Sequence, residues 1–142
     1  MVKLSPADSK DVQKFIGICQ QVLHEDLLSI ILFGSVAKGR SHRYSDIDFC
    51  IITKKNRENE KYNILKLFPR TCDVIMRVEY NLNDYLQNLS AVDLEIIEEG
   101  TTVYGLNITK EKKKILNDIK KKNHLIRKPE WGKGVWEIGA AS

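Results

Sequence analysis

The chain has 142 residues, of which 42% are hydrophobic and 30% charged, a balance that is typical of a globular protein with its own core. No apolar run reaches the roughly 20 residues of a membrane-spanning helix, and the N-terminal segment lacks an apolar signal-peptide core, so we expect a cytoplasmic protein without a membrane partner. The net charge of +4 is uneven, because residues 110–142 carry ten basic and four acidic side chains, whereas residues 1–109 carry thirteen and fifteen.

This asymmetry suggests two parts. We expect one domain over residues 1–108 and a basic C-terminal extension over residues 109–142, helical in part and with a segment containing Trp131 and Trp136 that docks on the domain or on a partner. The cysteines, Cys19, Cys50 and Cys72, are widely spaced, which favours reduced, buried thiols over a disulfide or a zinc site.

The predicted elements alternate between helix and strand. Ser5 before Pro6 is typical of a helix start, and apolar residues recur at helical spacing up to Leu23. The elements that follow are, in chain order, a buried strand at Leu27–Phe33, a strand at Asp46–Thr53, a helix from Asn56 that ends before Pro69, a strand at Thr71–Val78, a short helix at Asn81–Leu89, a helix at Ala91–Glu99 and an edge strand at Thr101–Tyr104.

The link between the first two strands is too short for a crossover helix, which argues against a doubly wound sheet. We therefore predict an α/β protein of the α+β kind: a small mixed β-sheet with helices packed mainly on one face.

The segment Gly34–Ser41, "GSVAKGRS", is close to a phosphate-binding P-loop, but arginine replaces the required lysine. A P-loop also runs into a long helix, whereas this chain reaches a predicted strand by Asp46. A strand-end glycine still allows close backbone approach to an anion, and one helical turn over Val36–Gly39 would direct free N–H groups toward it. The alternative is a plain Gly-Ser turn.

Asp46 and Asp48 are two residues apart on a predicted strand, so both carboxylates project from one face with Cα atoms about 7 Å apart. Two like charges repel there, and Mg²⁺ would turn that repulsion into binding. Two solvated acids at a frayed strand start are the alternative for this pair alone. If the next strand is a neighbour, Asp73 joins them, and three carboxylates can hold two cations about 3.5–4 Å apart.

The Gly-Ser segment and the aspartate pair fit one sequence pattern. Gly34-Ser35, ten residues, and then Asp46-x-Asp48 resemble the G-S-x(10)-D-x-D signature of the minimal nucleotidyltransferases, within the DNA polymerase beta-type nucleotidyltransferase superfamily. The segments "FGSVAKG", "SDID" and "IIEEGTTVYG" are also similar in sequence to that family, and the resemblance covers roughly residues 10–106.

The resemblance implies a nucleotidyltransferase fold and a Mg²⁺-dependent enzyme. Gly34 and Ser35 would hold the triphosphate of ATP or another NTP, and Asp46 and Asp48 would coordinate two Mg²⁺ ions. Asp73 would share one metal and help to deprotonate the attacking hydroxyl. The reaction would transfer a nucleoside monophosphate, with AMP the expected group, and release pyrophosphate.

Three basic residues, Lys38, Arg40 and Arg43, add positive charge beside the expected nucleotide, and Lys38 stands where many relatives carry arginine. Minimal members of the family are often antitoxins paired with a HEPN-domain toxin, and some add AMP to a tyrosine of that toxin. The resemblance therefore implies a partner protein as acceptor.

Other functions stay open at this point. The chain could bind a nucleotide or a toxin without catalysis, or it could modify a small molecule as aminoglycoside adenylyltransferases do, although only about 35 residues follow the match to enclose such an acceptor. The lysines of the extension could also contact nucleic acid, although charge runs are usually solvated faces. The sequence leaves the base preference and the oligomeric state open.

Overall fold

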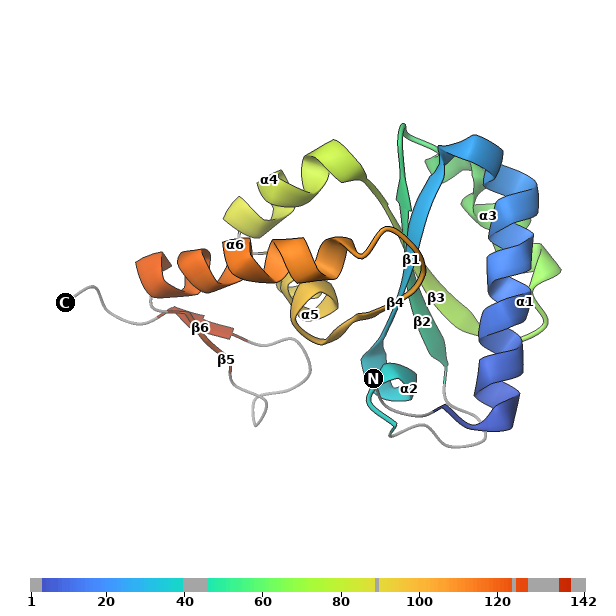
Figure 1. Ribbon diagram of the computed structural model, residues 1–142, viewed down its shortest axis with the longest axis horizontal. Coiled ribbons are helices and arrows are strands. Elements are labelled where there is room, and N and C mark those ends of the chain that lie inside the picture. Colours follow the sequence, from blue (N-terminus) through green and yellow to red (C-terminus); the bar gives the residue numbers. More distant parts are fainter. Residues whose placement is uncertain (1–3, 40–45, 89, 124, 128–135, 139–142) are drawn as a thin grey trace.

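The computed structural model describes residues 4–39, 46–88, 90–123, 125–127 and 136–138 (Figure 1). The helices are α1 (Pro6–Leu23), α2 (Gly34–Ala37), α3 (Lys61–Leu67), α4 (Leu82–Gln87), α5 (Ala91–Glu99) and α6 (Ile108–Asn123). The strands are β1 (Leu27–Phe33), β2 (Ile47–Thr53), β3 (Cys72–Val78), β4 (Thr101–Gly105), β5 (Leu125–Arg127) and β6 (Trp136–Ile138). Short 3-10 turns lie at His24–Asp26, Glu58–Glu60 and Glu79–Asn81.

Four strands form one mixed sheet in the order β3-β2-β1-β4. The strand β1 is antiparallel to both β2 and β4, whereas β2 and β3 are parallel and are joined through α3. This arrangement confirms the predicted mixed sheet and excludes a doubly wound one. It also places β3 and β4 at the two edges, as was expected for β4.

Helices cover both faces of this sheet, which corrects the expectation that they pack mainly on one face (Figure 1). One core cluster joins α1 and α3 to one face, and a second joins α4, α5 and α6 to the other. The reason lies in the central strands, where every residue of β2 and every residue of β1 except Leu28 is buried. Strands that are apolar on both faces must be covered on both.

The face that carries α1 is held by aromatic packing. Phe15 of α1 stacks on Phe49 of β2 with ring centroids 3.8 Å apart, and Phe68 meets both rings edge-on. The helix begins as predicted, because the Ser5 hydroxyl accepts a hydrogen bond of 3.1 Å from the Asp8 N–H.

On the other face, α5 is anchored by a buried ion pair. Asp93 accepts a 3.1 Å hydrogen bond from the Arg77 Nε of β3, and the Arg77 guanidinium lies 4.3 Å from the centre of the Tyr85 ring. The Ser90 hydroxyl donates to the same Asp93 carboxylate at 2.8 Å. The helix ends at Gly100 as predicted, where a side chain would clash with the Ile96 carbonyl.

The basic extension begins with α6, which packs on the domain. Leu116 and Ile119 are buried against α4 and α5, and Lys120 forms an ion pair of 2.7 Å with Glu98 of α5. The strands β5 and β6 then pair antiparallel, but Trp131 lies outside the described residues. The domain boundary at residue 108 stays a prediction.

Cys19 and Cys50 are buried free thiols and Cys72 is half-buried, consistent with the expectation of reduced cysteines. Within the described ranges, no helix combines the length and the apolar content that crossing a bilayer requires.

Candidate active site

The Gly-Ser pair lies where the central strand β1 ends. Gly34 has a φ of 77°, a conformation that favours glycine, and it turns the chain directly into α2. The helical turn therefore begins two residues earlier than the predicted Val36–Gly39. Because the first N–H groups of a helix have no intrahelical partner, the Ser35 region presents backbone donors at the end of the sheet.

Asp48 lies on β2 between two neighbouring strands. Its partner across the antiparallel ladder is Phe33, the residue before Gly34, and its partner in the parallel ladder is Asp73 of β3. Asp48 is 8% exposed, whereas Asp73 is exposed. Asp46 precedes the strand, which begins one residue later than predicted, and is exposed.

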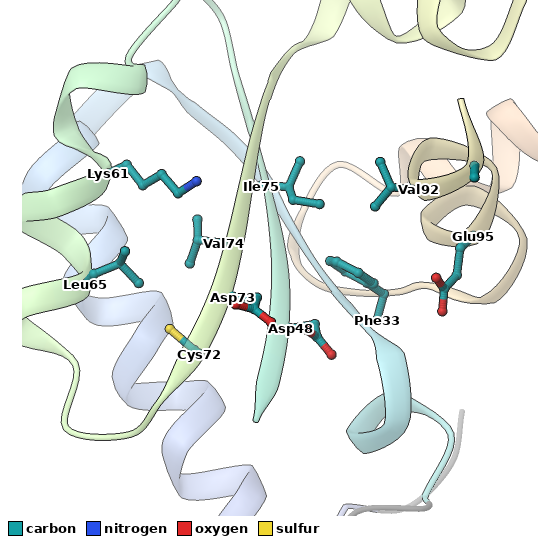
Figure 2. A pocket seen from close by; sticks show the side chains of 11 residues that line it. Phe33, Asp48, Lys61, Leu65, Cys72, Asp73, Val74, Ile75, Val92 and Glu95 are labelled. Atoms are coloured by element: carbon teal, nitrogen blue, oxygen red, sulfur yellow. The ribbon is translucent and has the colours of Figure 1, made fainter. Parts of the chain in front are cut away.

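The register brings two of the three predicted carboxylates together. Paired residues on neighbouring parallel strands project from the same face, and the strands lie about 4.8 Å apart, so the side chains of Asp48 and Asp73 are neighbours (Figure 2). Asp46 is two residues from Asp48, which places it near the same end of the sheet. The condition on which the sequence argument made Asp73 depend, that its strand is a neighbour of the strand of Asp48, is met.

The half-buried thiol of Cys72 responds to this cluster. Burial, together with the negative charges of Asp73, Asp46 and Asp48, raises the pKa of Cys72 to about 11, while Arg70 opposes the rise. The three carboxylates thus act on the same thiol.

The donor set suits a hard cation, since all three groups offer carboxylate oxygens and Mg²⁺ prefers oxygen ligands. Among the described residues, however, no group of three His, Cys, Asp or Glu side chains is arranged closely enough to hold a metal ion. Mg²⁺ is commonly held by one or two carboxylates with substrate phosphates as its other ligands, and the neighbouring pair Asp48 and Asp73 suits that mode.

A cavity of about 560 Å³ opens beside the two aspartates (Figure 2). The edge strand β3 lies between its two walls, one from α3 and the other from α5. Its lining residues are Phe33, Asp48, Lys61, Leu65, Cys72, Asp73, Val74, Ile75, Ala91, Val92 and Glu95.

Lys38, predicted to face the nucleotide, has carboxylate partners in this structure. Its ammonium contacts Glu99 and lies 3.6 Å from Glu95, both on α5. A role on a phosphate would require Lys38 to leave these acids. Arg40 and Arg43 lie outside the described residues, so their role at the nucleotide stays a prediction.

Sequence reasoning missed two charged residues of the cavity. Both lie within predicted helices, Lys61 in the helix from Asn56 and Glu95 in the helix at Ala91–Glu99, and neither was singled out. Glu95 is 4% exposed, and its place directly between Leu94 and Ile96 was a signal that could have drawn attention to it.

Comparison with known proteins gives a consistent family. A family profile described as "Polymerase beta, Nucleotidyltransferase" matches residues 13–121. The protein named "Putative protein adenylyltransferase MJ1305", from Methanocaldococcus jannaschii, is 33% identical over 86 residues, which cover 59% of this chain. The chain spans about half the length of this curated relative, at 52%.

Solved structures share the fold. A toxin–antitoxin structure with AMP-PNP matches with a TM-score of 0.55 at 18% identity, covering 79% of this chain and 91% of that one. Spectinomycin adenyltransferase from Enterococcus faecialis, solved with ATP and spectinomycin, matches with a TM-score of 0.54 at 14% identity, covering 72% and 58%. At such identities the likeness concerns the fold alone.

Proposed function

Because the chain belongs to the polymerase beta nucleotidyltransferase family, we propose that it transfers a nucleoside monophosphate, AMP from ATP, to a hydroxyl group of a partner protein. The observation that carries the proposal is the ladder register that sets Asp48 beside Asp73, with the end of β1 and Gly34 on the other side of Asp48. A triphosphate cradle and a carboxylate pair are then adjacent.

Each part of the site has a chemical task. The backbone at Gly34 and Ser35 binds the triphosphate, and Asp46, Asp48 and Asp73 would hold Mg²⁺. The metal would neutralise phosphate charge and stabilise the attacking and leaving oxygens. The acceptor oxygen forms a bond to the α-phosphorus, the bond from that phosphorus to pyrophosphate breaks, and the hydroxyl proton passes to Asp73.

The choice of a protein acceptor rests on two likenesses. The relative from Methanocaldococcus jannaschii carries the name of a protein adenylyltransferase, and one structure that shares the fold is a toxin–antitoxin structure with an ATP analogue. We therefore propose that the chain acts as the antitoxin of a toxin–antitoxin pair and modifies a HEPN-type toxin.

The test is incubation with labelled ATP, Mg²⁺ and the protein encoded next to this chain, followed by mass spectrometry to locate the adduct. Transfer of AMP to one hydroxyl-bearing side chain is the expected result. Parallel reactions with the other nucleotides define the base preference. Efficient transfer to spectinomycin or another aminocyclitol, with none to protein, would instead assign the small-molecule activity that the second fold neighbour carries.

A further inference from the structure

The outer edge of β3 offers backbone hydrogen-bonding groups beside the carboxylate pair. Among the described strands, β3 pairs with β2 alone. The Thr71 carbonyl accepts a hydrogen bond of 3.4 Å from the Ile47 N–H of β2, so Thr71 faces β2. Since the N–H and C=O of successive strand residues alternate in direction, those of Cys72, Val74 and Met76 point away from the sheet.

This edge is closed at one end. The Met76 carbonyl accepts a hydrogen bond of 3.0 Å from the Arg77 guanidinium, which is itself held by Asp93. The stretch from Cys72 to Val74 has no such cover from Arg77, and it contains Asp73, the residue in register with Asp48. Val74 is 4% exposed and Cys72 is half-buried, so a partner would reach this part of the edge through the cavity that it lines.

The cavity follows the same edge. Four consecutive residues of β3, Cys72 to Ile75, line it. Residues from both sides of the sheet also line it, Lys61 and Leu65 of α3 as one wall and Val92 of α5 in the other, so the cavity runs past the strand edge (Figure 2).

We propose that the acceptor segment of the partner protein binds here as an extended strand and pairs with the backbone of Cys72 and Val74. This inference rests on the proposed function and names how its acceptor is held. Strand addition to a free sheet edge lets main-chain hydrogen bonds supply affinity and flanking pockets supply side-chain selectivity.

The geometry also fixes the register of the bound strand. The acceptor residue lies opposite Asp73, so its hydroxyl is on the α5 side of the sheet, where Asp48 also lies. The residues on either side of the acceptor then face α3, next to Leu65 and Lys61. The preferred acceptor sequence is therefore a hydroxyl residue with an apolar or acidic neighbour.

The first experiment compares Cys72→Pro with its matched control Cys72→Ala. Proline removes an N–H that points away from β2, at the first residue of an edge strand, where proline is tolerated. Both variants lose the thiol, so the difference between them reports the N–H. The substrates are short synthetic peptides, each with one central Tyr, Ser or Thr, offered with labelled ATP and Mg²⁺.

We expect Cys72→Pro to transfer AMP to peptide about tenfold more slowly than Cys72→Ala, the effect of one lost backbone hydrogen bond. The melting-temperature rise caused by Mg-ATP should be the same in both variants. Equal transfer rates would overturn the inference. So would a parallel loss of Mg-ATP stabilisation, since the cavity would then hold the nucleotide.

A second measurement does not depend on the folding of Cys72→Pro. The best peptide is N-methylated at one backbone amide at a time and tested with the unaltered protein. Only every second amide of a paired strand faces β3, so the loss of transfer should alternate along the peptide. If methylation at every amide left the transfer rate unchanged, strand pairing would be overturned. Transfer to an intact protein or to RNA, with none to any peptide, would overturn it as well.

A chain that neither binds Mg-ATP nor transfers AMP would overturn the proposed function, and the inference with it.

Discussion

At the scale of single residues, Asp48 is the buried member of the carboxylate pair. It is 8% exposed and lies in register with Asp73, which is exposed, so the two like charges repel each other across neighbouring strands. Under the proposed function, a bound Mg²⁺ would relieve this repulsion, which gives the carboxylate pair a role that folding alone does not require.

Asp48→Asn should leave the metal-free protein as stable as the unaltered chain, or slightly more stable, because one repulsive charge is removed. The rise in melting temperature on adding Mg-ATP should shrink, and AMP transfer should fall about 100- to 1,000-fold, since a charge-stabilising group is lost. Thermal melts and the labelled-ATP assay measure both effects. The control is Asp118→Asn on the exposed side of α6; equal ligand-induced shifts in the two variants would remove Asp48 from the metal site.

The buried thiol of Cys50 makes the stability of the core depend on pH, which can be tested. Burial raises the pKa of the Cys50 thiol to about 12 from 9.0, with the charge of Asp93 adding to the rise and Arg77 opposing it. The unfolded chain therefore loses its thiol proton first, so this contribution to stability is present below pH 9 and is lost as the pH rises toward 12.

Cys50→Ala should consequently show a shallower loss of stability between about pH 8 and pH 10.5 than the unaltered protein, even if it is less stable at neutral pH. Urea denaturation at a series of pH values measures the difference. Parallel stability curves for the two proteins would show that Cys50 ionises normally in the folded state.

The site residues differ in how far the sequence predicts them. The pattern of Gly34, Ser35, Asp46 and Asp48 is local and could be read directly, and the apolar alternation around Asp73 identified its strand. The contacts of Lys38 with α5 could not be predicted, because they join residues about sixty positions apart. They depend on where α5 packs, and no local sequence pattern determines that.

At the scale of elements, the four strands of the main sheet were predicted to within one residue, because short β-branched runs ended by polar or glycine residues have few other interpretations. The layering was predicted wrongly. The sequence predicted a basic, partly helical extension but not what its apolar residues contact, whereas Leu116 and Ile119 cover α5, and this packing completes the second layer. The pairing of β5 with β6 was not predicted either, since each has only three residues.

The ion pair between Arg77 and Asp93 ties α5 to β3 and thereby sets one wall of the cavity. The Asp93 side chain is fully buried, so Arg77→Ala should destabilise the protein by about 3–5 kcal/mol by leaving that carboxylate without its guanidinium. Lys120→Ala is the control, because its partner Glu98 is 31% exposed and such pairs contribute less than about 1 kcal/mol. Equal losses in urea denaturation would contradict this role of Arg77.

Helix α6 should act as part of the folded core rather than as a detachable tail. Leu116 is fully buried, so Leu116→Ala should cost about 2–5 kcal/mol, and Lys113→Ala on the exposed face should change stability by less than about 0.5 kcal/mol. Chemical denaturation compares the two. A negligible effect of Leu116→Ala would mean that α6 does not pack on α5 in solution.

At the scale of the whole molecule, the sheet organises function by bringing three distant segments to one end. The turn after β1, the start of β2 and the start of β3 meet there, and α3 and α5 rise on either side of the β3 edge (Figure 1). The sequence signature predicts which residues take part, but only the strand order β3-β2-β1 makes them neighbours. The proposed chemistry thus depends on topology as much as on the residues themselves.

The central claim is that Asp48 and Asp73 act as one unit in AMP transfer, and a double-mutant cycle tests it most directly. Asp48→Asn, Asp73→Asn and the double variant are compared for the rate of labelled AMP transfer to the neighbouring protein, with Mg-ATP saturating. If the carboxylates share metal ions, either single change should remove most of the activity and the double variant should be no worse, as expected for residues that act as a unit. Independent losses that add, or full transfer by the double variant, would contradict the account.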